Sequence, residues 1–346
     1  MTEPTLKANF YSDTQTRPTR AMLETALTAE VGDEQSFRDP TTNALCERVA
    51  ELLGQEAAVF LPSGTMCNEI SLAVHTRPGD EVICERTCHI IGYEGGGPAA
   101  ISGIMTNPID GEHGQYTADQ LRAVIRPPSR YAPISTVAAV EQTANHGGGA
   151  VWPAAQLIEV AEAAKEAGLA AHMDGARLMN AAVAAGVPAR DFAAPFDSVW
   201  IDFTKGLGCG VGAALAGSRD FIERAWRYKQ MWGGAMRQSG ILAAQAIYAL
   251  DHNVDRLADD HALAASLAQR IAQMPGVAGV VTPQTNILLF DLAEERPMAE
   301  ALAATLLEDG VRVSVFGPRR IRVVTHMDVG EAEGDILIEA LGRHVG

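Results

Sequence analysis

Short apolar runs alternate along the chain with longer segments that carry apolar residues at helical spacing. Five runs have the length of a buried strand, and most have Gly or Pro nearby: 57–61, 81–84, 136–140, 169–173 and 198–201. Runs that are apolar throughout are typical of strands covered on both faces. Between them, Ala-rich segments such as 154–171 place Leu157, Val160, Ala161 and Ala164 on one helical stripe. This alternation predicts a doubly wound α/β fold with a mostly parallel sheet.

The last third of the chain has a different pattern. The Ala-rich stretch 241–272 continues the helical spacing, and 255–275 predicts a long helix. Four short apolar runs with one intervening helix follow, at 277–281, 286–290, 311–315 and 321–325. A length of 346 residues favours about two domains. We therefore expect an N-terminal arm and large domain over 1–253 and a smaller α+β domain over 254–346.

Composition narrows the class of protein. Apolar types make up 47% of the residues, enough for a substantial core. The net charge of −16 argues against nucleic-acid and anionic-membrane partners. No apolar run reaches the length of a membrane span, and the polar N-terminus lacks the apolar centre of a secretory signal. The five cysteines lack CxxC spacing, and Cys84, Cys88 and His89 have no second ligand pair, so we expect reduced thiols, no metal site and a cytoplasmic location.

The first candidate for chemistry is Lys205, which follows the predicted strand 198–201. A lysine at the end of a buried strand is costly unless its amine is paired or covalently used. Four glycines follow it at alternate positions: Gly206, Gly208, Gly210 and Gly212. One interpretation is a turn with an extended lysine, and a second is a dinucleotide loop of the weak GxGxxA type. The third is a Schiff-base lysine that holds pyridoxal phosphate (PLP).

Asp174 stands at the end of the predicted strand 169–173. In PLP enzymes a carboxylate keeps the pyridine nitrogen protonated, so that the ring can accept electrons. The alternative is a helix-capping Asp with Arg177 as its surface partner. Asp174 lies 31 residues before Lys205, the length of one βαβ unit, so neighbouring strands can deliver both side chains to one crevice.

Two further segments follow predicted strands. Ser63, Gly64 and Thr65 open a helix, whose free N–H groups suit a phosphate, although an ordinary N-cap explains the same residues. His89 follows the strand 81–84 and could stack on a flat cofactor and move protons. The alternative for His89 is a hydrogen-bonded core histidine.

Together these segments resemble the low-specificity L-threonine aldolases, which are PLP enzymes of the aspartate-aminotransferase-like fold type I. The resemblance covers most of the chain in the same order. It rests on the segments 11–19, 32–41, 62–66, that around His89, 141–143, 174–177, 205–207, 236–238 and 321–326. It implies a large domain with a mostly parallel seven-stranded sheet and a smaller C-terminal α+β domain.

The resemblance also implies how the cofactor is held. Lys205 would bond to the cofactor, Asp174 would pair with its pyridine nitrogen, and His89 would stack on its ring. Gly64 and Thr65 would hold its phosphate. Arg237 would reach the phosphate in a neighbouring subunit, because these enzymes build shared sites in homo-oligomers, often tetramers.

For the substrate, the resemblance implies that Ser12, Arg177 and Arg322 grip the carboxylate, with Arg177 also close to the cofactor. Arginine forks suit a planar anion. The implied reaction is retro-aldol cleavage of a β-hydroxy-α-amino acid, L-threonine or L-allo-threonine, to glycine and an aldehyde. His89 or an ordered water would be the base.

The chain departs from the family pattern around the substrate side chain. Ser36 and Phe37 replace a Tyr-Gly pair, and Glu141 begins EQTANH where the family has ENTHN. A second family histidine aligns close to Tyr131. These changes leave open phenylserine or 3-hydroxyaspartate as substrates, another PLP-dependent lyase, and a transaminase. A PLP-binding protein without turnover and a dinucleotide-dependent oxidoreductase are weaker alternatives.

Overall fold

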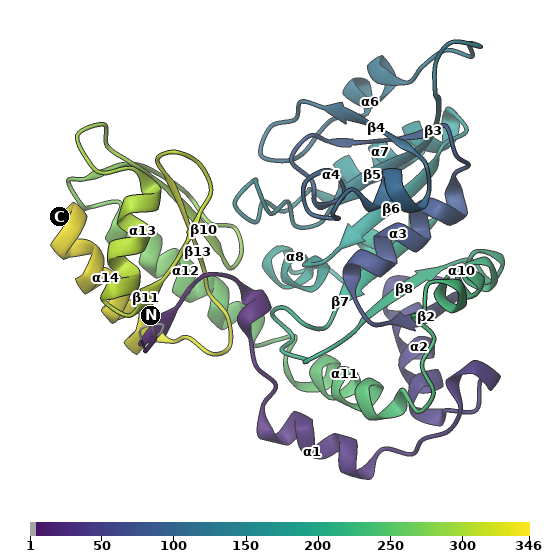
Figure 1. The fold of residues 1–346 in the computed structure, drawn as a ribbon, viewed down its shortest axis with the longest axis horizontal. Helices are drawn as coiled ribbons and strands as arrows, with labels where there is room; N and C mark the ends of the chain where they lie inside the picture. The colour runs from purple at the N-terminus through teal and green to yellow at the C-terminus, as the bar shows by residue number, and fades with distance from the viewer. Residues whose placement is uncertain (1–4) are drawn as a thin grey trace.

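A seven-stranded sheet forms the centre of the larger lobe in this computed structural model, which describes residues 5–346 (Figure 1). The first four residues of the expected N-terminal domain lie outside that range. The strand order is β2-β8-β7-β6-β5-β3-β4. The strands are β2 (Ala57–Leu61), β3 (Asp80–Glu85), β4 (Met105–Ile109), β5 (Ile134–Glu141), β6 (Ala170–Gly175), β7 (Ser198–Asp202) and β8 (Ala213–Gly217).

Strand directions confirm the predicted, mostly parallel α/β sheet. β8 runs antiparallel to both of its neighbours, β2 and β7, whereas β3 to β7 pair in parallel. Two strands had no clear signal in the sequence. β4 contains Pro108, which an edge strand tolerates, and β8 reads AALAG, a composition that favours helix until both faces are buried.

Helices cover both faces of this sheet, which explains the uniformly apolar strands. In β2, Phe60 faces one layer of helices, while Val59 and Leu61 face α3 and α10 on the other side. The first layer consists of α1 (Arg20–Thr28), α2 (Pro40–Leu53), α6 (Ala118–Val124), α7 (Ala154–Glu166), α8 (Leu178–Ala185), α9 (Ala189–Ala193) and α11 (Gly240–His252). The opposite side carries α3 (Gly64–His75), α4 (His89–Gly92), α5 (Gly97–Ile101) and α10 (Arg219–Met231).

The smaller lobe has its own antiparallel sheet and core. The sheet order is β12-β13-β10-β9, and the strands are β9 (Val277–Val281), β10 (Ile287–Leu292), β12 (Ser314–Val315) and β13 (Arg320–Val324). Three helices pack with it: α12 (Leu257–Ile271), α13 (Ala299–Glu308) and α14 (Glu331–Val345). The apolar run 311–315 is not one strand, because it divides into β11 (Val311–Arg312) and β12.

The start of the chain belongs spatially to the smaller lobe. β1 (Ala8–Asn9) pairs in parallel with β11, and Phe10 is buried in the core of that lobe. The chain then crosses to the larger lobe through the short 3-10 helix Asp13–Gln15 and continues into α1 (Figure 1). A second 3-10 helix, Glu34–Ser36, precedes α2. The crossing places Ser12 and Asp13 between the two lobes.

A helix that crosses a membrane must be long and mostly apolar. Within residues 5–346, the helices include none whose length and apolar content would suffice for a membrane span.

The buried stripe of α7 makes a test of the core. Replacing the fully buried Leu157 by Ala should lower the free energy of unfolding by about 2–5 kcal/mol, because the sheet and helices cannot close the cavity. Its neighbour Ile158 is 38% exposed and is the matched control, for which we expect a loss of about 1 kcal/mol or less. Urea denaturation measures both, and equal losses would contradict the assignment of this face to the core.

Candidate active site

A cavity of about 580 Å³ opens at the carboxyl ends of the central parallel strands, between the two lobes. Ligands of open α/β sheets bind at this edge, and the volume suits a small molecule. Six of the residues singled out in the sequence line it together: Ser12, His89, Asp174, Arg177, Lys205 and Arg322. The parallel pairing of β6 with β7 brings Asp174 and Lys205 to one edge.

Lys205 follows the end of β7 and is largely buried. Its Nζ atom lies 3.0 Å from Oδ2 of Asp202 and 5.6 Å from the centre of the Trp200 ring. Loop residues Gly206 to Gly212 then lead into β8. The ion pair with Asp202 balances the charge of the amine while its side chain lines the cavity.

Asp174 is buried near the end of β6. The amide of Asn68 donates a hydrogen bond to Oδ2 at 2.8 Å, and the backbone N–H of Ala176 donates to Oδ1 at 3.0 Å. Burial raises the pKa of Asp174, while the charges of His89 and Lys205 and the two hydrogen bonds act in the opposite direction.

His89 is the first residue of α4, just after β3. Its Nδ1 atom lies 2.7 Å from Oε1 of Glu94, and its backbone N–H donates to Glu141 at 2.6 Å. Burial lowers the pKa of His89, but the Glu94 hydrogen bond and the negative charges of Asp174, Glu94 and Glu141 outweigh burial and raise it. The Glu94 bond occupies Nδ1 and orients the ring.

The two arginines of the cavity differ in their partners. Arg177 donates from Nε and Nη2 to the two carboxylate oxygens of Asp13, both at 2.7 Å, and this pair is buried. Arg322, on β13, donates to Ser314 Oγ at 3.0 Å, to Asn145 Oδ1 at 2.7 Å and to the backbone oxygen of Tyr11 at 3.0 Å. Burial and the Arg177 charge lower the pKa of Arg322 to about 10.

Three predicted cofactor residues are not among the described residues that line this cavity. Gly64 begins α3, where a Cβ atom would overlap the Trp200 ring, and Thr65 is exposed beside it. Arg237 has a 64% exposed side chain and lies 3.3 Å from Asp33. The roles of all three stay predictions.

The structure adds three site residues that no sequence pattern indicated: Asp13, Asn68 and Glu94. Asp13 lies inside the motif 11–19, but nothing in the spacing links it to Arg177, which is 164 residues away. The substrate side-chain region also differs from expectation. Tyr131 is 89% exposed, whereas His146 accepts or donates a 2.7 Å hydrogen bond to Tyr93, which lines the cavity.

Over the described range 5–346, no group of three or more His, Cys, Asp or Glu side chains is arranged to hold a metal ion.

Known proteins share both the sequence and the fold of this chain. The model of the beta-eliminating lyase family matches residues 9–295. The chain is 41% identical over 326 residues to the low specificity L-threonine aldolase of Escherichia coli (strain K12), covering 94% of this chain and 95% of that protein. This chain belongs to the low-specificity L-threonine aldolase family of beta-eliminating lyases. The family resemblance predicted from the motifs is therefore confirmed.

Other members and solved structures agree with this family. The low-specificity L-threonine aldolase 1 of Arabidopsis thaliana is 40% identical, covering 93% of this chain and 91% of that protein. A threonine aldolase structure from Leishmania major aligns with a TM-score of 0.84 at 21% identity, covering 98% and 100% of the two chains. A putative L-allo-threonine aldolase from Listeria monocytogenes aligns with a TM-score of 0.81 at 22% identity, covering 98% and 97%. These two likenesses confirm the predicted fold.

The Arg177–Asp13 pair predicts a pH-dependent stability. Burial alone would raise the pKa of Asp13, but the Arg177 charge and hydrogen bonds, with Lys205 and Asn286, hold it well below its ordinary value. Asp13→Asn leaves a buried guanidinium unpaired, so we expect a loss of about 3–5 kcal/mol at pH 7. The difference in the free energy of unfolding between the variant and the wild type should be largest above about pH 5. It should shrink as the pH falls below about 4, where the carboxylate of the unfolded chain binds its proton.

Chemical denaturation across this pH range measures the difference. The matched control is Asp33→Asn, because Asp33 pairs with Arg237 on the surface and Asn can keep its helix cap. That change should cost about 0.5 kcal/mol or less at every pH. A constant penalty for Asp13→Asn down to pH 3 would contradict the argument.

Proposed function

We propose that this chain is a PLP-dependent aldolase that cleaves a β-hydroxy-α-amino acid, L-threonine or L-allo-threonine, to glycine and an aldehyde. The observation that carries the proposal is a single cavity lined by five of the predicted residues together: Lys205, Asp174, His89, Arg177 and Arg322. Membership of the family supports the same reaction, because its relatives in Escherichia coli and Arabidopsis thaliana are named for threonine cleavage.

The residues fit PLP by their chemistry. A largely buried amine, Lys205, and a buried carboxylate, Asp174, face one cavity, a pairing that suits an aldehyde and a ring nitrogen on one flat molecule. When bound, PLP supplies an aldehyde that bonds to amines and a protonated ring that accepts the electron pair released at the substrate α carbon. Lys205 would hold the aldehyde carbon, Asp174 the ring nitrogen and His89 a ring face, with Gly64 and Thr65 at the phosphate.

The two arginines would orient the substrate through its carboxylate. The pair with Asp13 uses Nε and Nη2 of Arg177, which leaves Nη1 for an anion. Arg322 is fixed by three hydrogen bonds, and burial together with the Arg177 charge lowers its pKa, an effect that a bound carboxylate would oppose. Ser12, on the crossing between the lobes, lines the same space. This clamp would align the bond to be broken.

His89 is the proposed base for the substrate β-hydroxyl. Glu94 holds its Nδ1 atom, so Nε2 is the nitrogen that can take the hydroxyl proton. The surrounding carboxylates raise the pKa of His89 and thereby favour the protonated ring that results.

We further propose a homo-oligomer in the cytoplasm with two domains divided near residue 253. Arg237 is exposed and would reach a phosphate in a neighbouring subunit. Exposed apolar side chains on the packed helices α1 and α11, including Leu23, Leu27 and Ile241, support a subunit contact there. All five cysteines lie in the described range and are free thiols, which suits a reducing compartment.

Removing the Lys205 amine tests the central proposal. Purified wild-type protein with PLP should show a visible absorption band and form glycine and acetaldehyde from L-threonine or L-allo-threonine. Lys205→Ala should abolish the band and lower the rate at least 1,000-fold, a rough figure for loss of a covalent group. Spectroscopy and a coupled aldehyde assay measure both.

The control is Lys165→Ala, because Lys165 lines a different cavity at the opposite edge of the sheet. It should leave both readings unchanged. A wild-type protein that stays colourless with PLP would overturn the proposal, and a keto acid formed without glycine would identify a transaminase instead.

The cavity wall favours aromatic substrates as a second candidate. Phe316 lines the cavity, stacks on His146 at 4.5 Å and lies under the Arg322 guanidinium, while Tyr93 stacks on His89 at 5.5 Å. Such a wall suits the ring of phenylserine.

Shortening this wall should change substrate preference. Phe316→Leu should lower kcat/KM for phenylserine about tenfold relative to threonine, because the ring loses its stacking surface. Steady-state kinetics with both substrates measure the ratio. Tyr131→Leu is the control. Because Tyr131 is 89% exposed, its replacement should leave the ratio of the two kcat/KM values unchanged. An equal loss for both substrates in Phe316→Leu would rule out a side-chain role.

A further inference from the structure

A chain of buried hydrogen bonds runs through the sheet layer from His75, at the end of α3, to the active-site carboxylates. His75 Nε2 lies 2.9 Å from Ser198 Oγ, which lies 2.9 Å from His172 Nδ1. His172 Nε2 lies 3.1 Å from Asn68 Oδ1, and the Asn68 amide nitrogen reaches Asp174 at 2.8 Å. Ser198, His172 and Asn68 are fully buried.

The orientation of the Asn68 amide follows from its neighbours. The indole N–H of Trp200 can only donate, and it contacts Asn68 at 2.7 Å, so the atom it meets is the amide oxygen. The amide nitrogen then donates one hydrogen to Asp174 and the other to Oε1 of Glu94, each at 2.8 Å. Both carboxylates therefore receive an N–H from one side chain.

The direction of the remaining bonds follows in turn. Because Asn68 Oδ1 only accepts, His172 must donate from Nε2. Burial, with the nearby His75, lowers the pKa of His172 to about 3, so the ring is neutral and its Nδ1 accepts. The hydroxyl of Ser198 donates to that nitrogen, and the Ser198 oxygen accepts from His75. Every bond of the chain points from His75 toward Asp174.

We propose that Asn68 and His172 are positioning residues for the cofactor: His172 holds the Asn68 amide so that both of its N–H groups face Asp174 and Glu94. Neither side chain is among those that line the cavity. Asn68 would keep Asp174 in the charged form that the ring nitrogen needs, and it would hold Glu94, which orients His89. One amide thus links the carboxylate at the cofactor ring with the carboxylate behind the proposed base.

Rotation of the Asn68 amide would be unfavourable. If it turned over, its oxygen would face two carboxylates and its nitrogen would face the N–H groups of Trp200 and His172, so the hydrogen bonds to all four partners would be mismatched or repulsive. Such buried mismatches are costly, and a hydrogen bond to a charged group contributes more than a neutral one. His172 and Trp200 both donate to the Asn68 oxygen, so both stabilise the orientation in which the amide nitrogen faces the two carboxylates.

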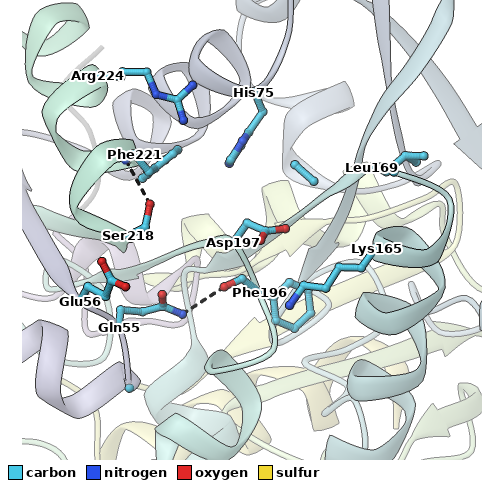
Figure 2. A pocket seen from close by; sticks show the side chains of 13 residues that line it. Gln55, Glu56, His75, Lys165, Leu169, Phe196, Asp197, Ser218, Phe221 and Arg224 are labelled. Carbon is cyan, nitrogen blue, oxygen red and sulfur yellow. Dashed lines mark hydrogen bonds between the residues drawn. The ribbon is translucent and has the colours of Figure 1, made fainter.

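His75, at the outer end of this series of hydrogen bonds, borders a second cavity and is not needed to orient Asn68. His75 stacks on Phe221 at 4.8 Å and borders a second cavity of about 680 Å³, at the edge of the sheet opposite the proposed active site. Figure 2 shows His75 beside Phe221 and Arg224, with Asp197 and Lys165 across the hollow. Loss of His75 would leave the Ser198 hydroxyl still donating to His172, so the Asn68 orientation does not depend on it.

A matched pair of substitutions tests the positioning role. His172→Gln keeps a donor for Asn68 and an acceptor for Ser198, whereas His172→Met fills a similar volume without a donor. The apparent Kd for PLP, titrated into the apo-protein by fluorescence, should rise about tenfold or more in His172→Met and by less than about threefold in His172→Gln. KM for threonine at saturating PLP should change little in both, because the arginine clamp is untouched.

Two further variants complete the experiment. Ser198→Ala removes one oxygen and frees His172 to take the other tautomer, so it should weaken PLP binding by about threefold to tenfold even if His172→Met does not fold. His75→Phe should stay within about threefold of the wild type. Thermal unfolding of each variant separates lost folding from lost positioning.

The inference rests on the proposed function, because the ionisation of Asp174 matters here only at a bound ring nitrogen. If the wild type binds PLP but the Gln and Met variants bind it equally well, the positioning role is wrong and the proposed function stands. Equal weakening by His75→Phe and Ser198→Ala would also overturn it, because a directional chain predicts a difference. A wild type that binds no PLP would overturn both.

Discussion

Keeping a carboxylate charged inside the protein is the constraint around which the proposed active site is built. Asp174 is buried, so its charge must be supported by nearby donors and cations. Asn68 and the Ala176 backbone donate to it, while His89 and Lys205 supply positive charge. Three separate strands and a helix must converge to provide these groups. The layered α/β fold supplies that convergence at one sheet edge.

A second buried charge connects the lobes. Asp13 follows β1, which pairs with β11 of the smaller lobe, while Arg177 follows β6 of the larger sheet. Their bidentate pair therefore ties the crossing segment to the carboxyl end of β6, at the cavity. Arg322 approaches from β13 and is held by Ser314 and Tyr11 on the small-lobe side and by Asn145 of the larger lobe. Substrate recognition would thus depend on the relative placement of the two lobes.

Much of the fold was predictable because buried strands and amphipathic helices leave local patterns. The five predicted strands of the large sheet are all present, and the α7 stripe is buried as expected. β4 and β8 were missed because Pro108 and an Ala-rich run resemble loop and helix until their neighbours are known. The run 311–315 divides because its two ends pair with different strands, β1 and β13. Pairing partners far along the chain leave no local signal.

The same distinction holds for chemistry. The sequence alone determined the family, the strand ends that carry functional residues, and the residue types for PLP chemistry, because Lys205, Asp174 and His89 follow recognisable strands. Only the tertiary structure decided that Asp13 neutralises Arg177 and that Asn68 joins Asp174 to Glu94, across 164 and 106 residues. Charge compensation is a short-range effect between groups brought together by folding. Its partners are therefore set by three-dimensional packing, and spacing along the chain does not record them.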